Sequence, residues 1–126
     1  MDRKFFLAAA VSAFIAVAAG AFGAHALKGQ LGADALAVFE VAVRYQMYHA
    51  LALIGVAWAC TRWPSRLVHA GGWLLAGGSW LFSGSLYLLC FTGVKWLGAM
   101  TPLGGAALLA GWLCLALGAA KPDPAA

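Results

Sequence analysis

The stretch FFLAAAVSAFIAVAAGAFGAHAL, residues 5–27, decides the fold. It is 23 residues long, has no Asp, Glu, Lys or Arg, and stands between Arg3 and Lys4 on one side and Lys28 on the other. A helix of that length rises about 35 Å, enough to cross a hydrocarbon core of about 30 Å. Its basic start and the segment 24–26 resemble a signal peptide and cleavage site, but its apolar part is longer than the usual ~7–15 residues. We therefore predict a retained transmembrane helix.

Three further apolar stretches follow, over residues 34–61, 67–91 and 96–119. The first of these is the most polar, and its strongly apolar part begins only at Ala50. It ends near Pro64, because a proline disfavours helical geometry in the residue before it. With short loops between the stretches, the pattern predicts an all-α fold, an integral membrane four-helix bundle.

Composition supports a bilayer as the solvent. Of the 126 residues, 64% are hydrophobic and 10% are charged, and the mean hydropathy is +0.88. Soluble domains carry about 25% charged residues, so this chain has too few to cover a water-facing surface. We predict a single transmembrane domain, residues 1–126. The net charge of +4 is spread over the ends of the apolar stretches, which indicates topology signals rather than nucleic-acid binding.

The distribution of Lys and Arg predicts the orientation. If each stretch crosses the membrane once, one side carries five of these residues and the other side three. The five are Arg3, Lys4, Arg62, Arg66 and Lys121, and the three are Lys28, Arg44 and Lys95. Because basic residues are enriched in cytoplasmic loops, we predict that both termini are cytoplasmic.

Small residues recur at four-residue spacing in the apolar stretches, as in Ala16, Gly20 and Ala24, or Ala107 and Gly111. This spacing places them on one helix face, where they allow two helix backbones to approach closely. We therefore predict close helix packing.

The cysteines Cys60, Cys90 and Cys114 lie in three different stretches, with no CxxC pair and no histidine at metal-ligand spacing. This dispersed set indicates neither a disulfide framework nor a zinc site. We predict free thiols that pack as small apolar side chains, and no metal.

Polar side chains gather toward the predicted outer ends of the helices. The candidate binding cluster consists of His25, Glu40, Arg44, Tyr45, Gln46, Tyr48, His49, Ser83 and Thr101. Glu40 and Arg44 have the i, i+4 spacing of an intrahelical ion pair. Such a pair is either solvated at the membrane interface or holds Arg44 ready for an anion such as a lipid phosphate. Thr101, directly before Pro102, is typical of a helix N-cap.

The two histidines of this cluster raise a separate question. His49 lies about one helical turn deeper than Arg44 and could meet His25 on the first helix. A metal or bis-histidine haem site would need further ligands or a cavity, and the other ligand types near His49 fall on a different helix face. We expect the embedded histidines to form hydrogen bonds with a neighbouring helix.

Four stretches together carry a family resemblance. They are GAFGAH at 20–25, FEVAVRYQMYHAL at 39–51, LFSGSLY at 81–87 and TPLGG at 101–105. In this order they resemble the small membrane proteins of domain of unknown function 423, whose relatives include eukaryotic transmembrane protein 256. The resemblance covers nearly the whole chain and implies four membrane helices in a bacterial inner membrane. It implies no established activity, substrate or cofactor.

No catalytic motif accompanies this pattern. Residues 81–85 lack the leading glycine of G-x-S-x-G, Glu40 is the one acidic residue deep inside a predicted span, and no phosphate-binding loop is present. We expect a non-enzymatic accessory, structural or assembly component that acts through helix packing, as a homo-oligomer or with other membrane proteins. The alternative is a module that binds or transports a lipid, a quinone or a small anion through the polar cluster. A membrane enzyme using His25, Tyr45 and His49 is the third possibility, and no cofactor is expected.

Overall fold

The computed structural model describes residues 2–122, and within that range it contains four α-helices and no strand. The helices are α1 (Arg3–His25), α2 (Ala33–Arg62), α3 (Arg66–Thr92) and α4 (Leu97–Ala120). Their ends lie within two residues of the bounds predicted from the sequence. The all-α, four-helix fold is therefore confirmed.

The structure shows how two of the helices begin. Asp2 caps α1, because its Oδ1 accepts hydrogen bonds from the backbone N–H groups of Lys4 and Phe5 at 2.9 and 3.4 Å. The prediction of Thr101 as an N-cap is wrong, because α4 already begins at Leu97 after a turn closed by backbone hydrogen bonds. The Thr101 hydroxyl instead lies 2.7 Å from the hydroxyl of Ser85 on α3.

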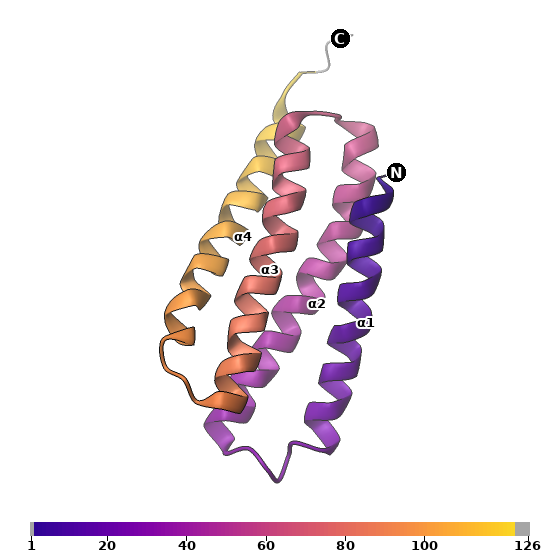
Figure 1. The fold of residues 1–126 in the computed structure, drawn as a ribbon. Coiled ribbons are helices and arrows are strands. Elements are labelled where there is room, and N and C mark those ends of the chain that lie inside the picture. Colours follow the sequence, from indigo (N-terminus) through magenta and orange to yellow (C-terminus); the bar gives the residue numbers. More distant parts are fainter. Residues whose placement is uncertain (1, 123–126) are drawn as a thin grey trace.

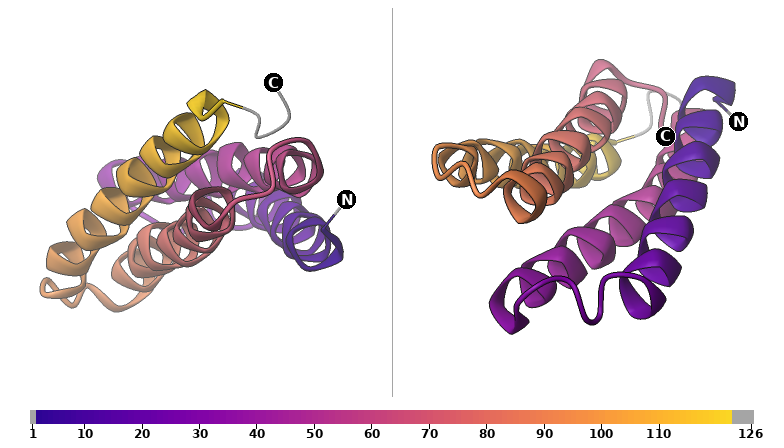
Figure 2. Two further views of the ribbon diagram at one scale, coloured as in Figure 1. Left: turned by 90° about the horizontal axis from the view of Figure 1, so that it is seen from above. Right: turned by 60° about the horizontal axis from the view of Figure 1, so that its bottom comes forward.

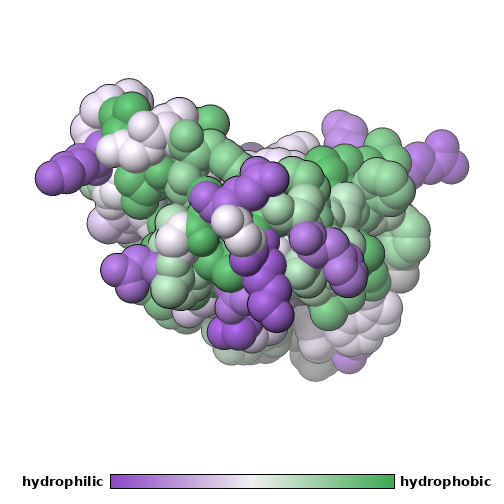
Figure 3. Space-filling view, turned by 90° about the horizontal axis from the view of Figure 1, so that it is seen from below, coloured by the Kyte–Doolittle hydropathy of each residue, from purple (hydrophilic) through white to green (hydrophobic). Residues whose placement is uncertain are grey.

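The helices form two antiparallel hairpins, α1 with α2 and α3 with α4, which join where α2 packs against α3 (Figures 1 and 2). The start of α1 and the end of α4 lie at one end of the bundle, and the α1–α2 and α3–α4 loops lie at the other (Figure 1). Figure 3 views that second end, where hydrophilic residues are separated by hydrophobic surface. Because α4 packs mainly on α3, its side toward α2 is left partly open.

Three of the helices, α1, α3 and α4, are long and apolar enough to cross a membrane. In the described chain α2 is also long, with 30 residues, but polar side chains interrupt it as far as His49, its 17th residue. Two of these, Gln46 and His49, are buried against other helices at 1% and 6% exposure. Some polar side chains of α2 therefore face into the bundle. Hydrogen-bond partners there reduce the free-energy cost of placing these side chains at membrane depth.

Glycines set the spacing of the α3–α4 hairpin. A Cβ added to Gly104 would lie 2.5 Å from the backbone nitrogen of Phe82, and one added to Gly78 would lie 3.1 Å from the carbonyl oxygen of Gly104. Neither position has room for a side chain, because the facing atoms belong to the neighbouring helix backbone. The predicted close packing through small residues is observed here.

Candidate functional site

The largest fully buried polar side chain, Gln46 of α2, joins three helices. Its Nε2 donates to the carbonyl oxygen of Ser12 on α1 at 3.2 Å, and its Oε1 accepts from the hydroxyl of Tyr87 on α3 at 2.6 Å. One turn away, the Ser83 hydroxyl donates to the carbonyl oxygen of Ala42 at 2.7 Å. These bonds link helix to helix inside the bundle, so Gln46 and Ser83 hold the structure together rather than face a ligand.

His49 lies about one turn further along α2 and faces α4. Its Nδ1 is 2.7 Å from the carbonyl oxygen of Tyr45, which can only accept, so Nδ1 carries the proton in the neutral ring. Its Nε2 then accepts a hydrogen bond from the indole Nε1 of Trp112 at 3.2 Å. Both ring nitrogens are thus engaged, and this histidine forms the interhelical hydrogen bond expected from the sequence.

A groove opens around His49 between α2 and α4, with Phe82 of α3 as part of its wall. Its volume is about 690 Å³, and it is lined by Tyr45, Tyr48, His49, Phe82, Pro102, Gly105, Ala106, Leu108, Leu109 and Trp112. Sites that bind small molecules typically have volumes of about 300–1,000 Å³ and mostly apolar walls. In size and chemistry the groove therefore suits a small apolar ligand.

Aromatic rings make up much of the groove wall. The ring of Tyr45 lies 4.7 Å from that of Phe82, measured between centroids, and the rings of His49 and Trp112 are 6.0 Å apart. The outer edge is formed by Tyr48 and Leu109, which are 57% and 74% exposed. His49 is the 17th of the 30 residues of α2. The groove thus opens sideways, near the middle of the bundle.

The ion pair of Glu40 and Arg44 lies away from this groove. Arg44 Nη2 is 3.9 Å from Glu40 Oε2, and the two side chains are 63% and 57% exposed. Both line a small hollow of about 150 Å³ between α1 and α2, on the other side of α2. An exposed pair at this distance contributes little to stability.

His25 is also remote from His49. It is the exposed last residue of α1, beyond Gly23, whose nearest neighbour across the helix pair is Phe39. His49 is ten residues further along α2 than Phe39 and faces α4. Among residues 2–122, no hydrogen bond or ring contact joins the two histidines, a question that the sequence had left open. The predicted cluster is divided into the buried network, the groove, the exposed ion pair and the separate His25.

The family described as "Protein of unknown function (DUF423)" matches residues 19–105. The chain belongs to this family. The resemblance noted in the sequence is thereby confirmed.

Other DUF423 relatives match over nearly their full length. A UPF0382 membrane protein of Staphylococcus saprophyticus is 44% identical, over 94% of this chain and 98% of the relative. YwdK of Bacillus subtilis, named as a membrane protein, is 43% identical over 94% and 98% of the two chains. YgdD of Escherichia coli strain K12, named as an inner membrane protein, is 41% identical over 96% and 93%. No solved structure matches this DUF423 chain, which is a membrane protein of a family whose function is not assigned.

Sequence reasoning included Tyr45, Tyr48 and His49 but missed the other seven residues that line the groove in this DUF423 protein. Phe82, Leu109 and Trp112 were read as ordinary apolar residues of a span. One signal was available, because tryptophan prefers the membrane interface and Trp112 is the 16th of the 24 residues of α4. A tryptophan this far from a helix end suggests that its indole N–H has a partner inside the protein.

Proposed function

We propose that this DUF423 protein is a non-enzymatic accessory protein of the membrane that binds a neutral, lipid-soluble ligand in the groove between α2 and α4. The observation that supports the proposal is the groove itself: about 690 Å³ of space with aromatic walls, beside a histidine that is already hydrogen-bonded. The ligand would enter from the hydrocarbon region, since the groove opens on the side of the bundle.

The lining argues for a particular ligand class. Neither Lys nor Arg is among the lining residues, so the groove offers no charge to hold a small anion. Aromatic side chains favour a flat ring in offset or edge-to-face contact, and the lining tyrosines can donate to a carbonyl oxygen. These features favour a quinone-type ring on an apolar tail over the anion or the charged lipid headgroup considered from the sequence.

The orientation proposed for the protein in the membrane places both termini in the cytoplasm. The charge distribution supports it, because Arg3, Lys4, Arg62 and Arg66 lie at the end of the bundle where α1 and α3 begin and α2 ends. The loop end carries Lys28 and Lys95. Membership of a family with a named inner membrane protein is consistent with this location.

Filling the groove should remove the ligand. We expect the Gly105→Leu variant to retain about tenfold less bound quinone than the unmodified protein, because the new side chain occupies the groove. The measurement is mass spectrometry of the lipids extracted from purified protein in detergent, relative to protein amount. The matched control is Gly55→Leu on α2, where a Cβ meets nothing within 4 Å and which does not line the groove. Equal quinone content in both variants would refute the proposal, as would a quinone-to-lipid ratio no higher than that of the membrane.

A second candidate function is assembly through helix packing, and the glycines of α3 favour it. Gly77 and Gly84 are seven residues apart on one helix face, and a Cβ at either position meets nothing within 4 Å. Trp80 lies between them and is 42% exposed. Gly77 is exposed and Gly84 is partly exposed, and small residues on one helix face let the backbone of another transmembrane helix approach closely.

Bulky side chains on this face should block assembly without disturbing the monomer. We expect the double variant Gly77→Ile/Gly84→Ile to lose the crosslinked dimer that the unmodified protein gives in membranes, with an unchanged circular dichroism spectrum. The control is Val17→Ile on α1, at a position that is 61% exposed. A dimer that persists in the double variant, or a protein that never crosslinks to itself, would contradict self-assembly through this face.

A further inference from the structure

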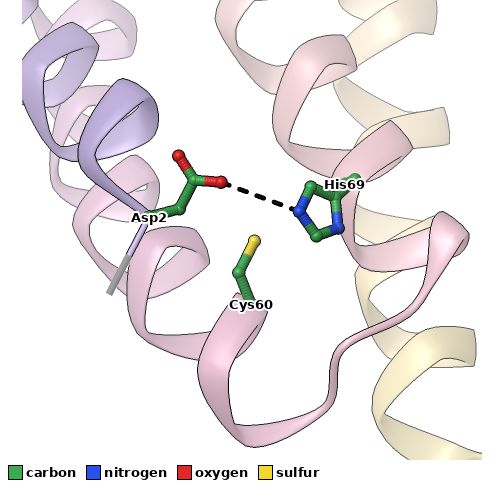
Figure 4. A group of neighbouring side chains, drawn as sticks. All are labelled: Asp2, Cys60 and His69. Atoms are coloured by element: carbon green, nitrogen blue, oxygen red, sulfur yellow. Dashed lines mark ion pairs between the residues drawn. The ribbon is translucent and has the colours of Figure 1, made fainter.

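Three side chains that bind metals in other proteins meet at the end of the bundle opposite the loops. Asp2 precedes α1, Cys60 lies in the last turn of α2 and His69 lies in the first turns of α3. The carboxylate oxygen, the thiol sulfur and an imidazole nitrogen lie within 4.8 Å of one another. Figure 4 shows the three side chains pointing toward one common space. This site is separate from the groove.

The hydrogen bonds of His69 prepare one nitrogen for a ligand. Its Nδ1 lies 3.0 Å from the carbonyl oxygen of Ser65, so the proton of the neutral ring is on Nδ1 and the lone pair is on Nε2. That lone pair faces Asp2 Oδ2 at 3.6 Å. Two acceptors that face each other need a proton or a cation between them. A backbone carbonyl on the far nitrogen is also the usual support of a metal-binding histidine.

Asp2 and Cys60 are held in place from outside the site. Oδ1 of Asp2 caps α1, which leaves Oδ2 directed toward His69, and the backbone N–H of Asp2 donates to the carbonyl oxygen of Ala57 at 3.1 Å. Cys60 is 9% exposed, on the turn of α2 that follows Ala57. The backbone bond between Asp2 and α2 therefore keeps the carboxylate next to the thiol.

We propose that Asp2, Cys60 and His69 bind one Zn²⁺ ion, which clips together the ends of α1, α2 and α3. Thiolate, imidazole and carboxylate are the three zinc ligand types, with bond lengths of about 2.3 Å to sulfur and about 2.0–2.2 Å to nitrogen and oxygen. Tetrahedral geometry then places the donor atoms about 3.3–3.6 Å apart. The carboxylate and imidazole already have this separation, and the thiol needs to approach by a rotation of its side chain.

The charges at this end of the bundle are compatible with such a site. Four basic residues lie nearby in sequence, namely Arg3, Lys4, Arg62 and Arg66. They would repel a free cation, but a thiolate and a carboxylate balance the two charges of Zn²⁺ and leave a neutral complex. The competing arrangement is an ion pair between a protonated His69 and Asp2 next to a free thiol, and it binds no metal.

Zinc binding by the full chain in detergent tests the proposal. After removal of metal with a chelator, we expect one Zn²⁺ per chain in competition with a chromophoric chelator. Cys60→Ser, His69→Gln and Asp2→Asn should each weaken the affinity by about tenfold or more, and Cys114→Ser and His25→Gln should leave it unchanged. Asp2→Asn is informative because asparagine caps a helix about as well as aspartate. Cobalt bound in place of zinc should give a thiolate-to-cobalt charge-transfer band that Cys60→Ser abolishes.

Thermal unfolding provides an independent readout, because an ion that binds the folded state raises its melting temperature. Zinc should raise the melting temperature of the unmodified protein and leave that of Cys60→Ser unchanged. Equal zinc affinity in the unmodified protein and the Cys60→Ser variant would overturn the proposal. So would a cobalt spectrum without the thiolate band, or an equal loss of affinity in Cys114→Ser.

Discussion

Replacement of Gly104 by alanine is expected to destabilise the protein by about 1–3 kcal/mol, the usual cost of overpacking a close contact. The new Cβ would lie 2.5 Å from the backbone nitrogen of Phe82, 2.8 Å from its Cα and 3.0 Å from the carbonyl oxygen of Gly78. These are backbone atoms of α3, so no side chain can rotate to make room. The hairpin of α3 and α4 has to open instead.

The adjacent glycine provides the control. A Cβ at Gly105 lies 3.9 Å from the ring of Phe82, an ordinary van der Waals distance, and alanine is favoured over glycine inside a helix by about 0.5–1 kcal/mol. Gly105→Ala should therefore match or exceed the unmodified protein in stability. The free energy of unfolding of both variants can be measured in mixed micelles by circular dichroism. If the two substitutions have the same effect, close backbone packing at Gly104 does not stabilise the hairpin.

The second large effect is expected for Gln46→Leu. This change removes the hydrogen bonds to Ser12 and Tyr87 and leaves the half-buried Tyr87 hydroxyl without its 2.6 Å partner. Loss of a partner for a buried polar group costs about 1–3 kcal/mol, whereas interhelical hydrogen bonds in membranes average about 0.6 kcal/mol. We expect a loss of about 1–3 kcal/mol in the free energy of unfolding.

A double-mutant cycle separates the hydrogen bond from the change in packing. Tyr87→Phe alone should lower the free energy of unfolding, because Gln46 Oε1 loses the hydrogen bond from the Tyr87 hydroxyl. The double variant Gln46→Leu/Tyr87→Phe should lose less than the sum of the two single changes, because neither polar group then remains unpaired. Tyr48→Phe, at a position 57% exposed, is the control for hydroxyl removal. Strict additivity in the cycle would show that the two side chains are not coupled.

Much of the architecture could be predicted from the sequence because its causes are local. The length and hydropathy of each stretch indicated four helices, and Pro64 and short loops placed their ends within two residues. The i, i+4 spacing of Glu40 and Arg44 predicted their ion pair, since a helix alone brings those side chains together. The start of α4 was predicted within one residue, but Thr101 was wrongly interpreted as its N-cap, whereas its hydroxyl contacts Ser85 of α3.

The site could not be predicted in the same way. In a bilayer the outside of a bundle is as apolar as its inside, so hydrophobic periodicity no longer shows which face of a helix is buried. This is evident in α4, whose apolar residues surround the helix, and hydropathy alone therefore could not distinguish Trp112 from a lipid-facing residue. The predicted cluster was also defined by the depth of its side chains along the helices. Side chains at similar depth but on different faces of α2 were therefore combined into one cluster.

The apolar stretch 5–27 and its three successors thus determined by themselves that this DUF423 protein is a helical membrane protein, because length and hydropathy act within one helix. The tertiary structure decided which distant residues meet. His49 and Trp112 are 63 residues apart in the chain, and Asp2, Cys60 and His69 come from the ends of three helices. Their meeting depends on how the helices rotate and pack against one another, and small-residue contacts such as that of Gly104 with Phe82 set this packing.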